Sequence, residues 1–296
     1  MNTQIDRLRE LICRYGFDKS AGELTALLEP SVLIRISRTA LDNFPLGASR
    51  FGGNPDLPAT MPWPAFRGQP LTLIAQLCLE DFVPYDLKRL LPKTGWLCLF
   101  LYPELNLFDQ GDPDCQVVYF DDEFGRLSRR QPDDGVRPFP ACRTELSGCY
   151  TLPDRSSMKA AAFVDTAERW DLYGDLLLEL RQMGVRNMPA EPRIPRLRRI
   201  FHGAQPYGFH QALGYPERDN LDPETIAQCL RGAGRPRAVA MSYEPSQDWV
   251  LLLDVRSDDN GLGVTWGSSG RLLFIIRRQD LLERRFEAVE LVTTYA

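Results

Sequence analysis

Two stretches of the chain share the same order of hydrophobic and polar positions. In each, a Gly-Pro turn precedes an apolar run that ends in a polar residue, and a second apolar run starts at a glycine. The first stretch has these segments at 51–55, 71–76 and 95–102. The second has them at 213–216, 249–254 and 270–276. Each stretch predicts a turn followed by two strands, and the shared order predicts duplication of one unit.

Helical patterns lie before and between these stretches. Thr3-x-x-Asp6 and Ser20-x-x-Glu23 predict two short helices within the first thirty residues. An apolar stripe predicts the longest helix over 166–183, ended by Gly184. The other expected elements are strands at 31–38 and 116–120, a helix from Asp222, a helix at 279–285 and an edge strand at 287–294.

Most predicted strands are joined by turns rather than by helix-length crossovers, which favours antiparallel or mixed sheets. We therefore expect an α+β fold, with mixed, mostly antiparallel sheets from two duplicated β-rich units and with peripheral helices. The expected domain is single and spans 1–296. Its parts are the N-terminal helices and first strand (1–40), the first unit (41–120), an insert with the long helix and a linker (121–206), and the second unit (207–296).

Composition places the chain among ordinary globular proteins, with 44% hydrophobic and 25% charged residues. The net charge of −5 gives no basic field for nucleic acid, and the arginine-rich run at 193–199 lacks aromatic residues for base stacking. No apolar run approaches the length of a membrane span. The polar N-terminus and seven cysteines without a C-x-x-C pair lead us to expect a reduced, cytoplasmic protein.

Known catalytic and metal motifs are incomplete in this sequence. The glycine run at 47–52 lacks the Lys-Ser/Thr of a phosphate loop, and the turn at 257–261 lacks both anchoring carboxylates of a calcium loop. His202 and His210 are the only histidines, so zinc would need two further ligands. We expect no cofactor and no metal. A Cys-His catalytic pair stays open as the less favoured alternative to structural roles.

The residues around the repeated turns form the candidate binding cleft. Arg50 and Asp56 flank a Gly-Gly turn that permits close approach, and they form either an internal ion pair, which we favour, or a pocket floor with Arg50 as an anion handle. Gln76 and Asp254 end matching strands and are expected to face each other between the units. The full candidate set is Arg50, Gly52, Gly53, Asn54, Asp56, Trp63, Gln76, His210, Tyr215, Asp254, Asp258 and Trp266.

Several segments together carry a resemblance to a known family. They are Ser49–Pro58 with Trp63-Pro64, Leu71–Leu77, Gly95–Phe100, His210–Pro216, Leu251–Asp258, and Trp266-Gly followed by Gly270–Ile276. In this order they resemble the YwqG-like family, a bacterial domain of unknown function, over most of the chain. The resemblance implies a single YwqG-like domain with an α+β fold and internal duplication, and it implies no established activity. Members commonly have a Gln soon after the Gly-Tyr-Pro turn, where this chain has Glu217-Arg-Asp-Asn220.

Two hypotheses for the function follow. The first is a non-enzymatic interaction protein whose acidic surface binds a basic toxin or effector, in the manner of an immunity protein or antitoxin, because family members resemble genes near toxin systems. The second is a small-molecule-binding or enzymatic protein with a polar cleft between the units, in which His210 lies beside Asp254 or Asp258. We favour binding over catalysis. The oligomeric state is not predicted.

Overall fold

The computed structural model describes most of the chain. The described residues are 3–39, 44–102, 115–121, 126–131, 136–157, 159–188, 209–216, 249–258, 261–266 and 270–294. The strands of the main sheet are β1 (Glu29–Arg38), β2 (Arg50–Phe51), β6 (Thr72–Cys78), β7 (Trp96–Leu101), β8 (Cys115–Phe120), β10 (Cys142–Thr151), β11 (Phe209–Ala212), β12 (Trp249–Arg256), β13 (Arg271–Arg277) and β14 (Glu290–Thr294). Two small pairs are β3 (Asp56–Pro58) with β9 (Leu127–Arg129), and β4 (Ala65–Phe66) with β5 (Gln69–Pro70).

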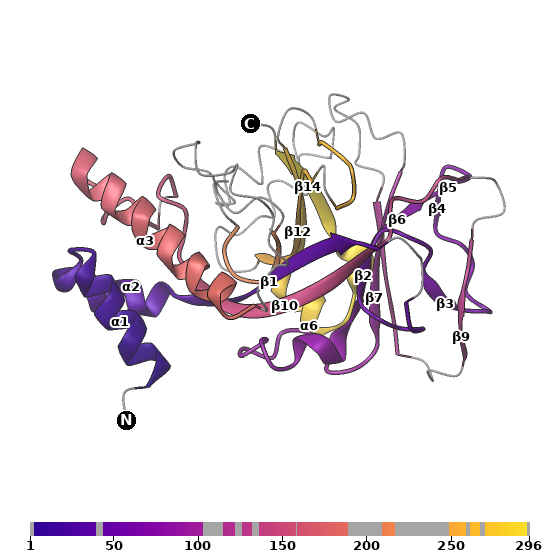
Figure 1. Ribbon diagram of the computed structural model, residues 1–296, viewed down its shortest axis with the longest axis horizontal. Helices are drawn as coiled ribbons and strands as arrows, with labels where there is room; N and C mark the ends of the chain where they lie inside the picture. The colour runs from indigo at the N-terminus through magenta and orange to yellow at the C-terminus, as the bar shows by residue number, and fades with distance from the viewer. Residues whose placement is uncertain are drawn as a thin grey trace.

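One antiparallel sheet of ten strands forms the centre of the molecule (Figure 1). The strand order is β14-β13-β12-β11-β1-β10-β2-β6-β7-β8. The expected α+β fold with mixed sheets from two duplicated units is therefore wrong: the fold is dominated by one continuous sheet. β1 and β10 join its two arms, because they pair in antiparallel register from Glu29 opposite Thr151 to Arg38 opposite Cys142.

β10 explains why the continuous sheet was missed. It lies within 121–206, which we expected to form an insert with the long helix and a linker. Ser147 and Gly148 lie near its middle and are poor strand formers. The strand is held instead by its full-length ladder with β1 and by α3, to which Ser147 Oγ donates at the Gly184 carbonyl oxygen (2.8 Å).

The helices are α1 (Gln4–Arg14), α2 (Ala21–Leu27), α3 (Ala167–Arg186) and α6 (Arg278–Leu282), with short 3₁₀ turns at Asp18–Ser20, Leu79–Phe82 and Phe286–Ala288. The predicted capping box of α1 is confirmed: Thr3 and Asp6 exchange hydrogen bonds between side chain and backbone. Thr166 caps α3, but the helix runs two residues past Gly184. A Cβ at Gly184 would lie 2.7 Å from Cys149 Cβ, so this glycine serves close packing against β10. The helix expected from Asp222 lies outside the described residues.

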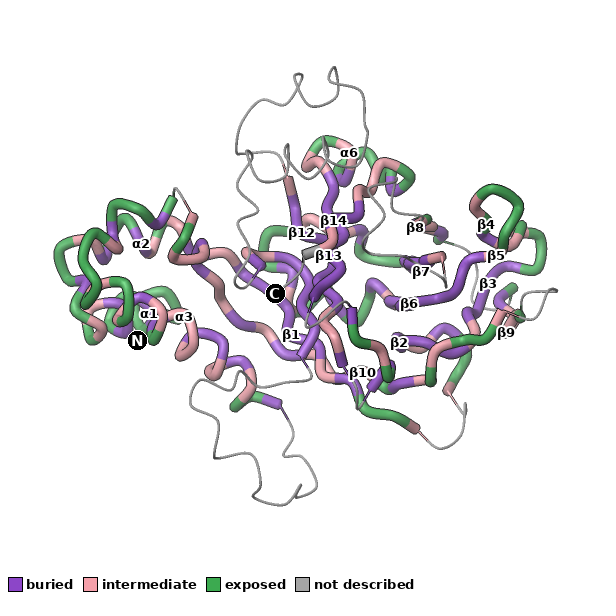
Figure 2. Tube along the Cα trace, turned by 90° about the horizontal axis from the view of Figure 1, so that it is seen from above, coloured by how far each residue is buried: buried purple, intermediate pink, exposed green. Residues whose placement is uncertain are grey.

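The sheet curls so that its two ends meet. The Tyr119 ring of β8 lies 5.1 Å from the ring of Phe286, which follows β13 and α6. The largest hydrophobic cluster fills the inside of this curve and draws on both arms, from Val32 and Phe51 to Phe274. Figure 2 shows most of the sheet strands buried, whereas β8 and β10 have many half-buried positions. Since side chains alternate along a strand, Leu33 and Arg50 belong to the opposite, outer face.

Different layers cover the outer face along its length. α3 covers the central strands, where Gly184 packs on Leu33 and Cys149. On its other side α3 buries Tyr173, Leu176 and Leu180 against α1 and α2, which form the helical end at the left of Figure 1. β3 and β9 cover the arm built by β2, β6 and β7. None of the described helices has the length and apolar content needed to span a membrane.

Candidate functional site

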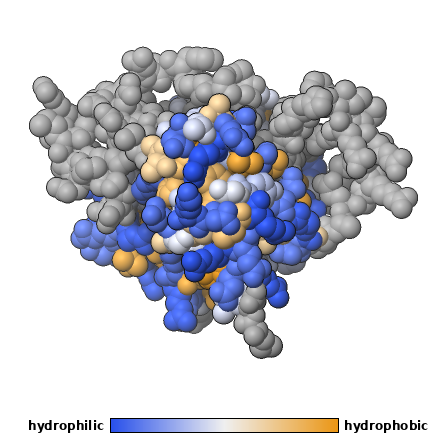
Figure 3. Space-filling view, turned by 90° about the vertical axis from the view of Figure 1, so that its left-hand side faces the viewer, coloured by the Kyte–Doolittle hydropathy of each residue, from blue (hydrophilic) through white to orange (hydrophobic). Residues whose placement is uncertain are grey.

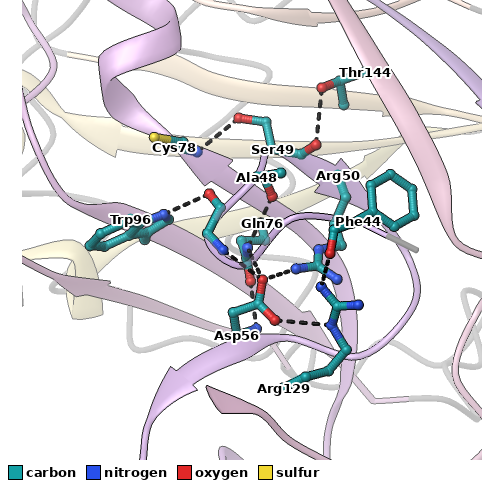
Figure 4. Close-up of polar contacts among 11 residues, drawn as sticks. Phe44, Ala48, Ser49, Arg50, Asp56, Gln76, Cys78, Trp96, Arg129 and Thr144 are labelled. Atoms are coloured by element: carbon teal, nitrogen blue, oxygen red, sulfur yellow. Dashed lines mark hydrogen bonds and ion pairs between the residues drawn. The ribbon is translucent and has the colours of Figure 1, made fainter. Parts of the chain in front are cut away.

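Arg50, Asp56 and Gln76 form a buried polar cluster on the outer face (Figure 4). Arg50 on β2 lies opposite Gln76 on β6, and its Nη2 donates to Asp56 Oδ2. Gly47 N (2.8 Å) and Gln76 Nε2 (3.2 Å) donate to the same oxygen, while Arg129 Nε donates to Asp56 Oδ1 (3.0 Å). Two of the side chains that bind Asp56 also fix neighbouring backbone: Gln76 donates to Ala48 O (3.0 Å) and Arg129 donates to Phe44 O (2.9 Å).

The Arg50 cluster is closed to solvent. Arg50, Asp56 and Gln76 each have 0% exposed surface. Gln76 accepts a hydrogen bond from Asp56 N (2.7 Å) and donates to Ala48 O (3.0 Å), so its amide ties together the two sides of the loop. This geometry is the internal ion pair that we favoured from the sequence. A buried, paired charge of this kind fixes the loop and leaves no anion handle at the surface.

Gly52 and Gly53 shape the turn that carries Arg50. Both have positive φ, and Gly53 N donates to Phe139 O (2.9 Å). A Cβ on Gly52 would lie 2.3 Å from Pro140 O, so only glycine fits against this neighbouring segment. Asn54 follows in the same loop and is half-buried. Trp63 fixes the following loop by donating to Leu71 O (3.0 Å) and packing edge-on against Phe100.

The other arm has a second polar cluster at the matching register. Gln211 on β11 lies opposite Asp254 on β12, as Arg50 lies opposite Gln76. Asp254 accepts from Arg271 Nη1 of β13 (3.1 Å), and Gln211 Oε1 accepts from Arg181 Nη1 of α3 (3.2 Å). The structure therefore places Gln76 and Asp254 in separate clusters rather than facing each other.

His210 lies on the inner face, within the core. It is fully buried, and its ring stacks on Phe51 of the opposite arm, with centroids 4.6 Å apart. Its Nδ1 accepts from Arg256 N (3.1 Å), and among the described residues no partner bonds Nε2. Burial lowers the pKa of His210 from 6.5 to about 3, partly opposed by the negative charge of Asp258. The imidazole is therefore neutral at physiological pH.

Asp258 and Trp266 shape the loop after β12. Asp258 accepts from Gly261 N (2.9 Å) at Oδ1, which is a turn contact. Trp266 packs edge-on against Phe139 of the other arm and is 5% exposed. Both side chains face the protein interior, so the candidate residues do not converge on one open cleft. Their role in binding stays a prediction.

A cavity of about 340 Å³ opens between α3, the end of β10 and the loop after β11. This α3 cavity is within the size range of small-molecule sites. Its lining residues are Tyr150, Thr151, Leu152, Asp154, Arg155, Asp171, Gly174, Asp175, Leu177, Leu178, Arg181, Gln211, Tyr215 and Pro216. Tyr215 is the only member of the sequence-derived candidate set in this lining.

Helical spacing explains the lining from α3. Asp171, Gly174, Asp175, Leu178 and Arg181 recur at intervals of three or four residues and therefore share one face of the helix. The sequence pattern revealed only the apolar face of α3. No sequence signal marked the cavity-lining face, because charged residues at helical spacing are typical of any solvated helix face.

The loop after β11 is held rigidly at the cavity wall. Gln211 Nε2 donates to Leu213 O (2.9 Å) and Tyr215 O (2.8 Å), while Tyr215 N donates to Thr151 Oγ1 (2.8 Å). Burial, helped by Glu29, raises the pKa of Tyr215 to about 12, so its hydroxyl stays protonated. The wall therefore offers a neutral phenol and fixed backbone groups.

The match with a known family covers most of the chain. Residues 49–293 match the family described as Domain of unknown function (DUF1963). The chain belongs to this family. The matched span of the DUF1963 family contains the Arg50 cluster, α3 and β11, whereas α1, α2 and β1 lie before it. No curated protein matches the chain significantly.

Cys142 and Cys149 of this DUF1963 protein are buried packing residues. Burial raises the pKa of Cys142 to about 12 and of Cys149 to about 11. A thiol with a raised pKa is protonated at neutral pH and is a poor nucleophile. Within the described parts of the chain, no three His, Cys, Asp or Glu side chains are grouped so that they could hold a metal ion.

Proposed function

We propose that this protein is a non-enzymatic binding protein and that its ligand occupies the α3 cavity. The observation that carries the proposal is the cavity itself, about 340 Å³ in volume and lined by charged side chains of both signs. A mostly preformed, concave site with a few polar groups is typical of small-molecule binding.

The chemistry of the cavity lining supports binding over catalysis. A general base needs a pKa near the working pH, and a nucleophile needs activation by such a base. Among the residues that the structure describes, the lining includes neither a histidine nor a cysteine. His210 and the buried thiols of Cys142 and Cys149 lie elsewhere, with pKa values shifted away from neutrality.

Binding of a basic partner protein is the second candidate function. It is supported by the exposed carboxylates of Asp171 and Asp175 beside Trp170, which is 36% exposed. Acidic surfaces accelerate association with basic partners. An immunity-like role, in which the partner is a basic toxin or effector, is one form of this second proposal. The assignment to the YwqG-like family is also a proposal.

Retention of a small molecule tests the proposed function. Purified protein is incubated with the fraction of a cell extract below 1 kDa, desalted and denatured, and the released compounds are identified by mass spectrometry. We expect the native chain to retain at least one compound, chemically unchanged. Gly174→Leu fills the cavity and should abolish retention, because even a Cβ at Gly174 would lie 2.8 Å from Arg155 Nη1.

Gly22→Ala is the matched control. Gly22 lies in α2 with nothing within 4 Å of its added Cβ, so retention should be unchanged. Circular dichroism establishes that each variant is folded. Equal retention by Gly174→Leu, or none by the native chain, contradicts the proposal. Chemical conversion of the retained compound would support the enzymatic alternative instead.

A further inference from the structure

The charges of the α3 cavity are arranged along its depth. Arg181 and Gln211 lie at the buried floor, with Arg181 5% exposed and Gln211 0% exposed. Asp171 and Asp175 are exposed at the opposite end of the same helix face. The cavity therefore has a cation at its floor and two carboxylates at its mouth.

The two carboxylates at the mouth repel each other. Asp171 and Asp175 are one turn apart on α3, a spacing at which like charges destabilise a helix. Among the described residues, neither has an ion pair. Arg155, the other cation in the lining, stacks on the Trp170 ring with Cζ 4.9 Å from the centroid, and its Nη1 lies 2.8 Å from the position of a Cβ on Gly174. A positive charge from a ligand would relieve this repulsion.

Apolar groups separate the two ends of the cavity. Leu152, Leu177 and Leu178 line it together with the rings of Tyr150 and Tyr215. Figure 3 views the molecule from its helical end, where hydrophilic side chains surround a smaller group of apolar ones. A ligand that matches this lining has a short apolar middle between two charged ends.

We infer that the α3 cavity binds a small zwitterion, with its anionic end toward Arg181 and its cationic end toward Asp171 and Asp175. This inference rests on the proposed function and adds the ligand class. Asp175 and Arg181 are six residues apart, about 9 Å along a helix axis. An extended peptide spans about 3.5 Å per residue, so di- and tripeptides have a suitable separation between their charged ends.

Three probes with the same carbon chain test this inference: 6-aminohexanoate, hexanoate and hexylamine, each titrated into the full chain by calorimetry. We expect 6-aminohexanoate to bind at least about fivefold more tightly than either singly charged probe, the gain of one partly buried ion pair. The double variant Asp171→Asn/Asp175→Asn should reduce its affinity to that of hexanoate. These exposed positions are chosen because Arg181 variants risk misfolding.

Each outcome of these titrations decides the inference. Equal binding of a singly charged probe, unchanged affinity in the double variant, or no binding of 6-aminohexanoate at 10 mM overturns the zwitterion assignment. These results do not contradict the proposed function if the native chain retains a compound from the extract and Gly174→Leu does not. Loss of that retention difference overturns the proposed function itself.

Discussion

The two arms of the sheet place a pair of polar residues at equivalent positions, but the two pairs form different kinds of site. On the outer face, Arg50 lies opposite Gln76 in one arm, and Gln211 lies opposite Asp254 in the other. In both arms the ladder to the next strand shifts register shortly before the polar residue, between Leu73 and Ala75 and between Leu251 and Leu253. The backbone geometry is thus similar, and the side chains and their covering layers differ.

The source of the charges decides whether a cluster is closed. In the Arg50 cluster, the cation is on the sheet and the loop after β2 brings Asp56 onto it, which seals the site under β3 and β9. In the other arm the sheet contributes the Asp254–Arg271 pair and the neutral Gln211, and the cation that faces Gln211 comes from α3. A helix laid across a curled sheet leaves the α3 cavity beside this contact. The loop that carries Asp56 therefore closes the Arg50 cluster to solvent, whereas α3 crosses the sheet and leaves the α3 cavity open beside it.

Removing the acid from each cluster should separate the arms most clearly. Asp56→Ala leaves buried Arg50 without this carboxylate, and we expect a loss of about 3–5 kcal/mol in the free energy of unfolding. Asp254→Ala should cost less, about 2 kcal/mol, because Arg271 at 9% exposure is closer to water. Urea denaturation measures both values.

Asp165→Ala is the control for these two variants. Asp165 forms a surface pair with Arg169 (3.5 Å) and is 63% exposed, so its loss should change stability by less than about 0.5 kcal/mol. If Asp254→Ala destabilises the protein as much as Asp56→Ala, the distinction between a sealed and a more open cluster is wrong.

The contact between the arms through His210 and Phe51 should make stability depend on pH. The folded pKa of His210 is lowered from 6.5 to about 3, so below pH 6.5 the unfolded chain binds a proton that the folded chain does not. Stability from this group is present above pH 6.5 and is lost as the pH falls toward 3. Between pH 7.5 and 4.5 the loss approaches about 2–3 kcal/mol.

His210→Gln removes this titration and keeps an acceptor for Arg256 N. The urea midpoint of the variant should therefore fall less between pH 7.5 and 4.5 than that of the native chain. The carboxylates titrate in both proteins, so the difference isolates His210. Identical pH profiles would show that the imidazole is accessible to protons in the folded state.

Local patterns identified many elements of this fold. Apolar runs predicted β6, β7, β12 and β13, and the apolar stripe over 166–183 predicted α3. β10 was missed because its ladder with β1 stabilises a polar, glycine-containing segment that has no strand pattern of its own. Gly184 was interpreted as a helix end because its packing on Cys149 depends on a distant strand.

The candidate site was predictable only where its partners are close in sequence. Arg50 and Asp56 are six residues apart, and their pairing followed from the turn between them. The α3 cavity joins residues of α3 to residues of β11, and no local pattern shows which face of a helix meets a distant loop. The polar face of α3 is indistinguishable, in sequence, from an ordinary solvated face.

An NMR titration compares the two arms directly. The compound retained from the cell extract is added to ¹⁵N-labelled protein, and changes in amide chemical shift are recorded. The account predicts shifts at residues 171–181 and 211–216 around the α3 cavity, with no change at residues 47–56 of the Arg50 cluster. Shifts concentrated at 47–56, with the α3 residues unaffected, would contradict it.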